Sequence, residues 1–413
     1  MNGCDSKFEG SHESHPGLKD YFVDLHIHIG RTEKGEPVKI SGSKDLTFYN
    51  IAKEASERKG IEVVGIIDCQ SPAVQEEIDA YLDKGEMEEL PGGGIRYART
   101  TVLLGSEIEV KDPGMGPVHL LAFMPTFAKM RDFTRWLGSR MKNVGLSSQR
   151  LYAPAKELQA ETAGRGGILI PAHIFTPYKS VYGSGTDRLS NLLDPDRVAA
   201  VELGLSADTE MAGYLSELDR YPFVTNSDAH SLGKIGREYN RIRMAEPTFA
   251  ELVLALRGEA GRGIAANYGL NPRLGKYHRT YCANCESILD ESETAAERCL
   301  YCGSSKIVRG VLDRIRTIGD RKEPLASPGR PPYRFQVPLE FVPGLGPKMR
   351  DRLLARFGTE MDILHRASKD ELAEAAGERI AETIISARTG GLQLEAGGGG
   401  KYGKISASGN HKK

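Results

Sequence analysis

Seven short apolar runs between residues 21 and 270 constrain the fold of this 413-residue chain more than any other feature. Amphipathic segments such as 47–58 and 249–257 lie between or after them, a spacing typical of repeated β-α units. This number of runs favours a parallel barrel over an open sheet, and polar residues at the strand ends would then converge on one rim. The runs are YFVDLHI, IEVVGIID, TVLLGSEIEV, HLLAFM, GGILIPAHI, VAAVEL and FVTNSDAH.

Composition narrows the class of protein. Apolar residues make up 39% of the chain and charged residues 27%, as in soluble globular proteins. No run of about 18 apolar residues is present that could span a membrane, and the polar first twenty residues lack the apolar centre of a secretory signal. We therefore expect a cytoplasmic protein. The net charge of −1 neither favours nor excludes nucleic acid, so DNA-binding residues would have to be concentrated locally.

Asp24, His26 and His28 lie two residues apart along the first run. On a strand they would face the same side, and metal ions supply the partners that such polar groups need. Histidine with carboxylate ligands suits zinc, manganese or iron, and a bridging carboxylate indicates two or more ions. The alternative is an edge strand with solvated histidines. Further candidate ligands at the ends of later runs are Asp68, Glu107, His119, His173, Asp228 and His230.

Taken in order, DLHIH, IID, GSEIEV, the run at His119, PAHIFTP and SDAH resemble the motifs of the PHP (polymerase and histidinol phosphatase) family over residues 20–270. The resemblance implies an α/β fold with a distorted (βα)7 barrel that hydrolyses phosphoesters. It also implies two or three divalent ions, zinc with manganese or magnesium as alternatives. We expect Asp228, Glu107 and His26 to be catalytic, with the loss of Asp228 the most damaging. The implied ligands are His26, His28, Asp68, Glu107, His119, His173, Asp228 and His230.

Two departures from the family pattern affect this ligand set. Cys69 replaces the histidine that many members carry after the second-motif aspartate, so Asp68 is assigned as the ligand. Many members also carry another histidine or aspartate soon after the first motif. Here the nearest acids are Glu33, Glu36 and Asp45, which leaves the coordination of one ion open.

Four of the six cysteines form two CxxC pairs, Cys282 with Cys285 and Cys299 with Cys302, separated by thirteen residues. Four thiolates at this spacing predict a closed tetrahedral site for one structural zinc ion. Nearby basic residues only slightly outnumber acidic ones, so both a DNA contact and a purely architectural role stay open for this ribbon.

Residues 342–358 (VPGLGPKMRDRLLARFG) resemble a helix-hairpin-helix. The turn at Gly344 and Gly346 would direct backbone N–H groups and a helix N-terminus at a DNA phosphate, with Lys348 and Arg350 adding charge. A weaker second copy follows near Ala376. The alternative is a plain helical bundle, since residues 341–390 carry equal numbers of basic and acidic groups.

A PHP barrel, a four-cysteine ribbon and a Pro-rich RPPY segment, together with IIDCQSP, HLLAFMP, PAHIFTP, VELGLSAD and SDAHS, resemble the endonuclease Q family over about residues 20–335. The resemblance implies a DNA repair enzyme that nicks 5′ to uracil, hypoxanthine, xanthine or abasic sites after extruding the damaged base. Tyr178 and Tyr182 in loop 175–185, and residues 202–208, are candidates for the base pocket. The alternatives are a histidinol-phosphatase-like phosphoesterase, a general DNA exonuclease and a DNA-binding scaffold with an inactive barrel.

These features predict six segments along the chain. They are a disordered N-terminus (1–19), the PHP barrel (20–272), the zinc ribbon (273–316), a proline-rich connector (317–338), the helix-hairpin-helix domain (339–392) and a disordered Gly-rich tail (393–413).

Overall fold

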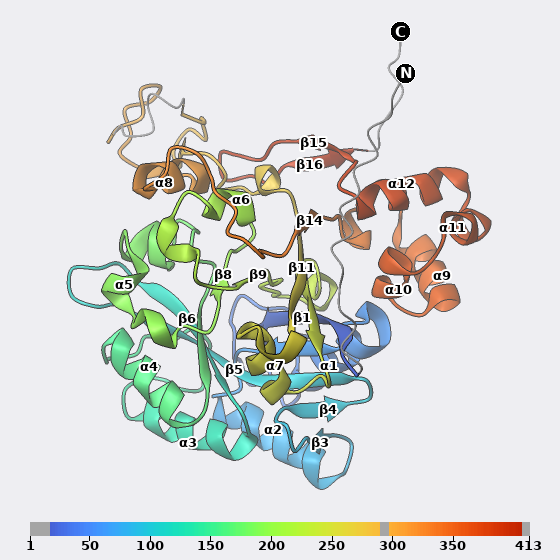
Figure 1. The fold of residues 1–413 in the computed structure, drawn as a ribbon, viewed down its shortest axis with the longest axis horizontal. Coiled ribbons are helices and arrows are strands. Elements are labelled where there is room, and N and C mark those ends of the chain that lie inside the picture. Colours follow the sequence, from blue (N-terminus) through green and yellow to red (C-terminus); the bar gives the residue numbers. More distant parts are fainter. Residues whose placement is uncertain (1–16, 290–296, 407–413) are drawn as a thin grey trace.

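The computed structural model describes residues 17–289 and 297–406, and it confirms the predicted α/β fold. Each of the seven apolar runs contains one strand of a distorted barrel (Figure 1). The ring is completed beside the first strand, where the amide of His28 donates to the carbonyl of Ala229 over 3.1 Å. In order round the ring the strands are β1 (Lys19–Ile27), β2 (Val63–Ile66), β5 (Thr100–Val110), β6 (Val118–Met124), β7 (Ile168–Pro171), β8 (Val201–Glu202) and β9 (Phe223–Val224).

Strand directions are mixed, whereas the sequence predicted a parallel barrel. β1, β2 and β5 are parallel neighbours, as are β8 and β9, but β6 is antiparallel to both β5 and β7. Residues 111–117 alone separate β5 from β6. This connection is too short for the crossover that a parallel neighbour requires, so the chain turns back on itself.

The sheet extends past the barrel on both sides. On one side β10 (Tyr239–Met244) pairs antiparallel with β1, and β11 (Gly263–Gly269) follows. On the other side β4 (Ile95–Tyr97) and β3 (Glu88–Glu89) extend β5. The helices of this region are α1 (Phe48–Glu54), α2 (Pro72–Asp83), α3 (Phe127–Gly138), α4 (Ala155–Gly164), α5 (Leu189–Leu192), α6 (Thr209–Ala212) and α7 (Phe249–Leu256).

The ribbon consists of β12 (Tyr281–Cys282) and β13 (Ile307–Val308), and α8 (Val311–Ile318) follows it. The connector predicted over 317–338 is extended but not free, because β14 (Tyr333–Phe335) pairs in parallel with β11. Arg330 holds the connector against the barrel just before β14. The guanidinium carbon lies 3.6 Å from the ring centroid of Phe223, and an N–H donates to the carbonyl of Leu218 over 3.1 Å.

The helical domain packs against the barrel through buried polar contacts. Lys59 Nζ lies 3.0 Å from a carboxylate oxygen of Glu360, and both side chains are buried. His365 packs on the ring of Phe22 at a centroid distance of 4.6 Å. These contacts fix the helices beside β1 and α1 (Figure 1). The helices are α9 (Pro347–Phe357), α10 (Glu360–His365), α11 (Lys369–Ala376) and α12 (Glu378–Arg388).

The prediction of a disordered tail is wrong for residues 393–406. β15 (Gln393–Glu395) and β16 (Lys404–Ser406) form a hairpin that crosses between the region of α8 and α12 (Figure 1). The predicted disorder of residues 407–413 and 1–16 concerns segments outside the described residues, and β1 already begins at Lys19, inside the predicted N-terminal segment. Over the described ranges, no helix has the length and apolarity needed to cross a membrane.

Candidate active site

The three polar residues of β1 are buried, and they divide into two roles. His26 and His28 extend into a group of further histidines and carboxylates. Asp24 instead accepts hydrogen bonds from the backbone amides of Ser227 (3.0 Å) and Gly236 (2.9 Å). Asp24 therefore anchors the loop that carries Asp228. Both oxygens of its carboxylate accept hydrogen bonds from this part of the backbone.

Seven of the eight predicted ligands form three adjoining clusters, each with its possible ligand atoms within 4.8 Å of one another. Because Glu107 and His28 each belong to two clusters, the clusters share edges and form one continuous centre. This arrangement is what two or three neighbouring ions with bridging ligands require. The clusters are His26 with His28 and Glu107, His28 with Asp228 and His230, and Glu107 with His119 and His173.

Asp68 is the predicted ligand that the structure places outside these clusters. Its Oδ2 atom lies 3.1 Å from His28 Nδ1 and accepts from the amide of Ile29 over 2.8 Å. A carboxylate in this position fixes the ring orientation of a histidine whose other nitrogen faces the centre. Cys69, next in sequence, is fully buried among apolar side chains.

The spacing within the clusters fits ligands of a common ion better than a hydrogen-bond network. His26 Nε2 lies 3.5 Å from Glu107 Oε1 and 3.4 Å from Asp228 Oδ1, which is long for hydrogen bonds. Two ligands of one tetrahedral ion at bond lengths near 2.0–2.1 Å lie about 3.3 Å apart. His26 Nε2 and His119 Nε2 are buried without a hydrogen-bond partner, whereas His119 Nδ1 lies 2.8 Å from Glu107 Oε1. The donor set therefore fits divalent metal ions.

The pKa shifts in the centre show that its buried carboxylates and imidazoles interact strongly. Burial alone would raise the pKa of Glu107, but the imidazoles of His119, His173 and His26 hold it well below its usual range. Burial opposes a charge on His26, yet Glu202 and Asp228 raise its pKa well above the usual value. The buried carboxylates of this centre are thus ionised and require neighbouring positive charge.

Two predicted site residues have a left-handed backbone. The φ angle is 45° at Asp228 and 31° at His173, and neither residue is glycine. Such conformations cost about 1–3 kcal/mol each and are concentrated at functional sites. Arg237 braces one of the two loops, because its Nε donates to the carbonyl of Ser227 over 2.7 Å and an Nη donates to the carbonyl of Asp228 over 3.3 Å.

Glu202, at the end of β8, belongs to the centre, although the sequence predicted it only as part of a candidate base pocket. Its carboxylate lies 3.0 Å from His26 Nδ1, and it accepts from the amide of His173 over 2.9 Å and from Asn226 Nδ2 over 2.7 Å. Its place at the end of the sixth apolar run is the sequence signal that could have identified it. Lys39, whose Nζ lies 3.5 Å from Glu107 Oε2, had no such signal.

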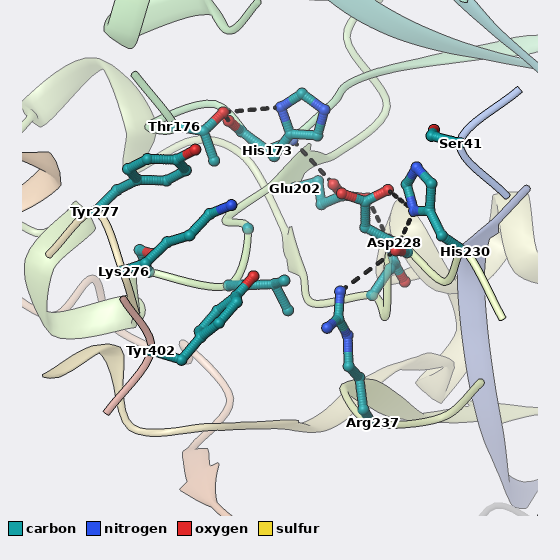
Figure 2. Close-up of a pocket in the computed structure, with 14 residues that line it drawn as sticks. Ser41, His173, Thr176, Glu202, Asp228, His230, Arg237, Lys276, Tyr277 and Tyr402 are labelled. Atoms are coloured by element: carbon teal, nitrogen blue, oxygen red, sulfur yellow. Dashed lines mark hydrogen bonds and ion pairs between the residues drawn. The ribbon is translucent and has the colours of Figure 1, made fainter. Parts of the chain in front are cut away.

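The clusters open into a cavity of about 410 Å³. Figure 2 shows His173, Glu202, Asp228 and His230 on one side of it, with Lys276, Tyr277 and Tyr402 on the other. The prediction that Tyr182 stacks on a base is wrong, because its ring is fully buried against Phe175 and its hydroxyl donates to Glu217 over 2.7 Å. Tyr178 is exposed and contacts Tyr277 edge-to-face at a centroid distance of 5.7 Å.

The four ribbon cysteines come together as predicted. Cys282 Sγ lies 3.6 Å from Cys302 Sγ, and Cys285 Sγ lies 3.7 Å from Cys299 Sγ. Thiolates bound to one zinc ion at about 2.3 Å are spaced by roughly 3.8 Å. All four sulfur atoms lie within 4.8 Å of one another, so the group fits a structural zinc ion.

The first hairpin of the helical domain also has the predicted backbone. Gly344 has a φ of 82°, and Gly346 is the N-cap of α9. Both glycines and Lys348 are exposed. Arg350 is only half exposed and lies near the barrel residue Glu54, where it opposes the rise in the pKa of that carboxyl that burial causes. Lys348 is therefore better placed than Arg350 to contact a ligand.

The sequence and the fold are similar to those of known proteins. Residues 208–260 match a family model described as PHP-associated. The uncharacterized protein YqxK of Bacillus subtilis is 52% identical over 390 residues, which are 94% of this chain and 100% of that protein. The crystal structure of the lesion-specific endonuclease EndoQ from Pyrococcus furiosus matches with a TM-score of 0.81 and 31% identity, covering 94% of this chain and 96% of that one.

The chain belongs to the endonuclease Q family. A second endonuclease Q structure, a complex with a 27-mer duplex that carries an abasic lesion at the active site, matches with the same TM-score of 0.81 and 31% identity. It covers 95% of this chain and 99% of that one, so the helical domain lies within the family fold. A shorter match, 47% identical over 53 residues, is to the UvrABC system protein C of Natronomonas pharaonis, of which it covers 9%. The predicted resemblance to endonuclease Q is thereby confirmed.

Proposed function

We propose that this chain is a metal-dependent endonuclease that nicks DNA on the 5′ side of deaminated bases (uracil, hypoxanthine, xanthine) or abasic sites. The observation that carries the proposal is the continuous centre of three His and carboxylate clusters at a 410 Å³ cavity, in a chain that shares its whole fold with endonuclease Q. A site of this kind acts on a nucleotide that has been extruded from the duplex.

The seven clustered residues would hold the ions, zinc or else manganese or magnesium, and Glu107 and His28 each belong to two of the clusters. Divalent ions held there would stabilise negative charge on phosphate oxygens and would make water a better nucleophile. The protein fixes the ligands in advance. Glu202 orients His26, Asp68 orients His28, and Arg237 holds the strained loop of Asp228.

The helical domain is the second element of the proposal. Exposed backbone at Gly344 and Gly346, beside Lys348 at the start of α9, suits contact with a DNA phosphate. Such contacts position a protein on the duplex without reading its sequence. The buried pair of Lys59 and Glu360 fixes this hairpin relative to the barrel, so a phosphate contact there would set where the metal centre meets the strand.

The test is a nicking assay on four duplexes that differ at one position: unmodified, uracil, hypoxanthine and abasic. We expect the wild-type protein with added metal to nick the last three, 5′ to the lesion. Asp228→Asn should lower the rate by about a hundredfold or more, while DNA affinity measured by fluorescence anisotropy stays within about twofold. Asp196→Asn, which neutralises an exposed carboxylate paired with Arg220, is the matched control and should be fully active.

Each alternative function gives a different result in this assay. Degradation of unmodified duplex from its ends would support a general exonuclease. Hydrolysis of small phosphomonoesters without nicking would support a histidinol-phosphatase-like enzyme. Binding of all four duplexes without any cleavage would support a scaffold with an inactive barrel. An Asp228→Asn protein as active as wild type would remove Asp228 from the metal centre.

A further inference from the structure

Three side chains line the cavity on the side opposite the metal-binding clusters. Lys276 and Tyr277 precede the ribbon, and Tyr402 lies between β15 and β16. Lys276 Nζ lies 4.7 Å from the ring centroid of Tyr277 and 5.5 Å from that of Tyr402. Figure 2 shows the lysine between the two rings, with its ammonium directed into the cavity. We call these three residues the aromatic wall.

The charge of Lys276 is available to a ligand. Within residues 17–289 and 297–406, no carboxylate forms an ion pair with it, although its side chain is half-buried. Burial opposes its charge, but the interaction with Tyr277 and the nearby phenols outweighs that effect and raises the pKa of Lys276. An ammonium group offers three hydrogen-bond donors and no acceptor. A ligand that enters between the rings therefore meets a donor-only group.

The hairpin holds Tyr402 in place. The amide of Gly397 donates to the carbonyl of Arg273 over 2.7 Å, and the amide of Gly403 donates to the carbonyl of Leu274 over 2.9 Å. Lys401 pairs with Glu286 of the ribbon. Tyr402 also lines a neighbouring cavity of about 430 Å³, together with Lys404 and Ile405 of β16. Its exposed fraction of 57% leaves much of the side chain accessible to a ligand.

We propose that the aromatic wall selects the base, with Tyr277 and Tyr402 flanking its plane and Lys276 donating a hydrogen bond to the carbonyl oxygen that deamination creates. This inference rests on the proposed function. Deamination of cytosine, adenine or guanine replaces an exocyclic amino group, a donor, with a carbonyl, an acceptor. The Lys276 ammonium satisfies the carbonyl but directs its N–H groups at the N–H groups of the amino form. Buried mismatches of this kind give strong discrimination.

The decisive quantity is the rate of nicking at uracil or hypoxanthine divided by the rate at an abasic site, because an abasic nucleotide has no base to recognise. Lys276→Met keeps the length of the side chain and removes its donors. Loss of a hydrogen bond to a charged donor should lower this ratio by about tenfold to a hundredfold. The matched control is Lys404→Met, which removes an exposed charge beside the neighbouring cavity and should leave the ratio unchanged.

A second pair of variants tests whether the Tyr402 ring stacks on the base. Tyr402→Leu should lower the same ratio by about tenfold through loss of stacking, whereas Tyr402→Phe should keep it near the wild-type value. Circular dichroism and the metal content of each variant check that the fold is retained. A Lys276→Met or Tyr402→Leu protein with the wild-type ratio would overturn the inference. A wild-type protein that nicks no lesion, the abasic one included, would instead overturn the proposed function.

Discussion

Replacing Glu202 with glutamine tests whether the metal centre depends on a residue that need not touch an ion. Glu202 is fully buried, and its two oxygens accept from three donors: a ring nitrogen of His26, the amide of His173 and the side-chain amide of Asn226. Glutamine has nearly the same shape but only one acceptor oxygen. In either orientation, its NH2 group faces at least one of these donors.

The expected loss follows from this count. One buried donor left without an acceptor costs about 1–3 kcal/mol. If the donor left without an acceptor is the His26 ring nitrogen, the ring is no longer held in its orientation. Metal affinity should then drop by about tenfold to a hundredfold, as is usual when a residue that orients a metal ligand is replaced. The activity at saturating metal should recover to a large part of the wild-type value, because the ligands that contact the ions are all present.

Competition with a chromogenic zinc chelator measures the affinity, and nicking of abasic duplex over a metal titration measures the recovery. Glu217→Gln is the matched control. Glu217 also accepts from a phenol and an amide, those of Tyr182 and Leu189, but it does not line the cavity. An unchanged affinity in Glu202→Gln would refute the orienting role. A loss of several thousandfold would show that Glu202 itself binds an ion.

Three further predictions concern the rest of the molecule. Cys282→Ser should release one tightly held zinc ion per chain and lower the melting temperature, because a structural site contributes on the order of 10 kcal/mol to folding; unchanged zinc by elemental analysis would rule the site out. Burial raises the pKa of Glu238 to about 8, so its folded form keeps a proton that the unfolded chain releases near 4.5, and stability falls as pH rises between these values. Glu238→Gln can still accept from the amide of Leu270, so in urea unfolding it should exceed wild-type stability at pH 9 by on the order of a few kcal/mol and match it near pH 4.5. Lys348→Ser should weaken binding to all four duplexes alike and make the log–log salt dependence shallower by about one unit, whereas a loss confined to lesion DNA would contradict a phosphate contact.

The sequence predicted the positions of the seven barrel strands and most of the metal-binding clusters for a physical reason. Period-two alternation along β1 requires His26 and His28 to share a face, and the ends of neighbouring strands meet at one rim. Seven predicted ligands therefore come together. The features that the sequence did not predict depend on packing between residues far apart in the chain. Tyr182 is buried by contact with Phe175, and Glu202 meets His26 across 176 residues of chain, neither of which a local pattern encodes.

The C-terminal hairpin shows why composition alone gives a wrong prediction of disorder for residues 393–406. A Gly-rich, basic segment is usually unable to bury enough apolar surface to fold, which is why we predicted disorder. Here the glycines instead let one backbone approach another. A Cβ atom at Gly399 would lie 2.4 Å from the carbonyl oxygen of Glu286, and one at Gly397 would lie 2.7 Å from that of Leu274. The segment is therefore ordered by close backbone contact with the ribbon, and this contact holds Tyr402 at the cavity. Removing residues 339–413 as a unit would take away the hairpin together with the helices, so point variants are required to separate DNA positioning by the helical domain from base selection by the aromatic wall.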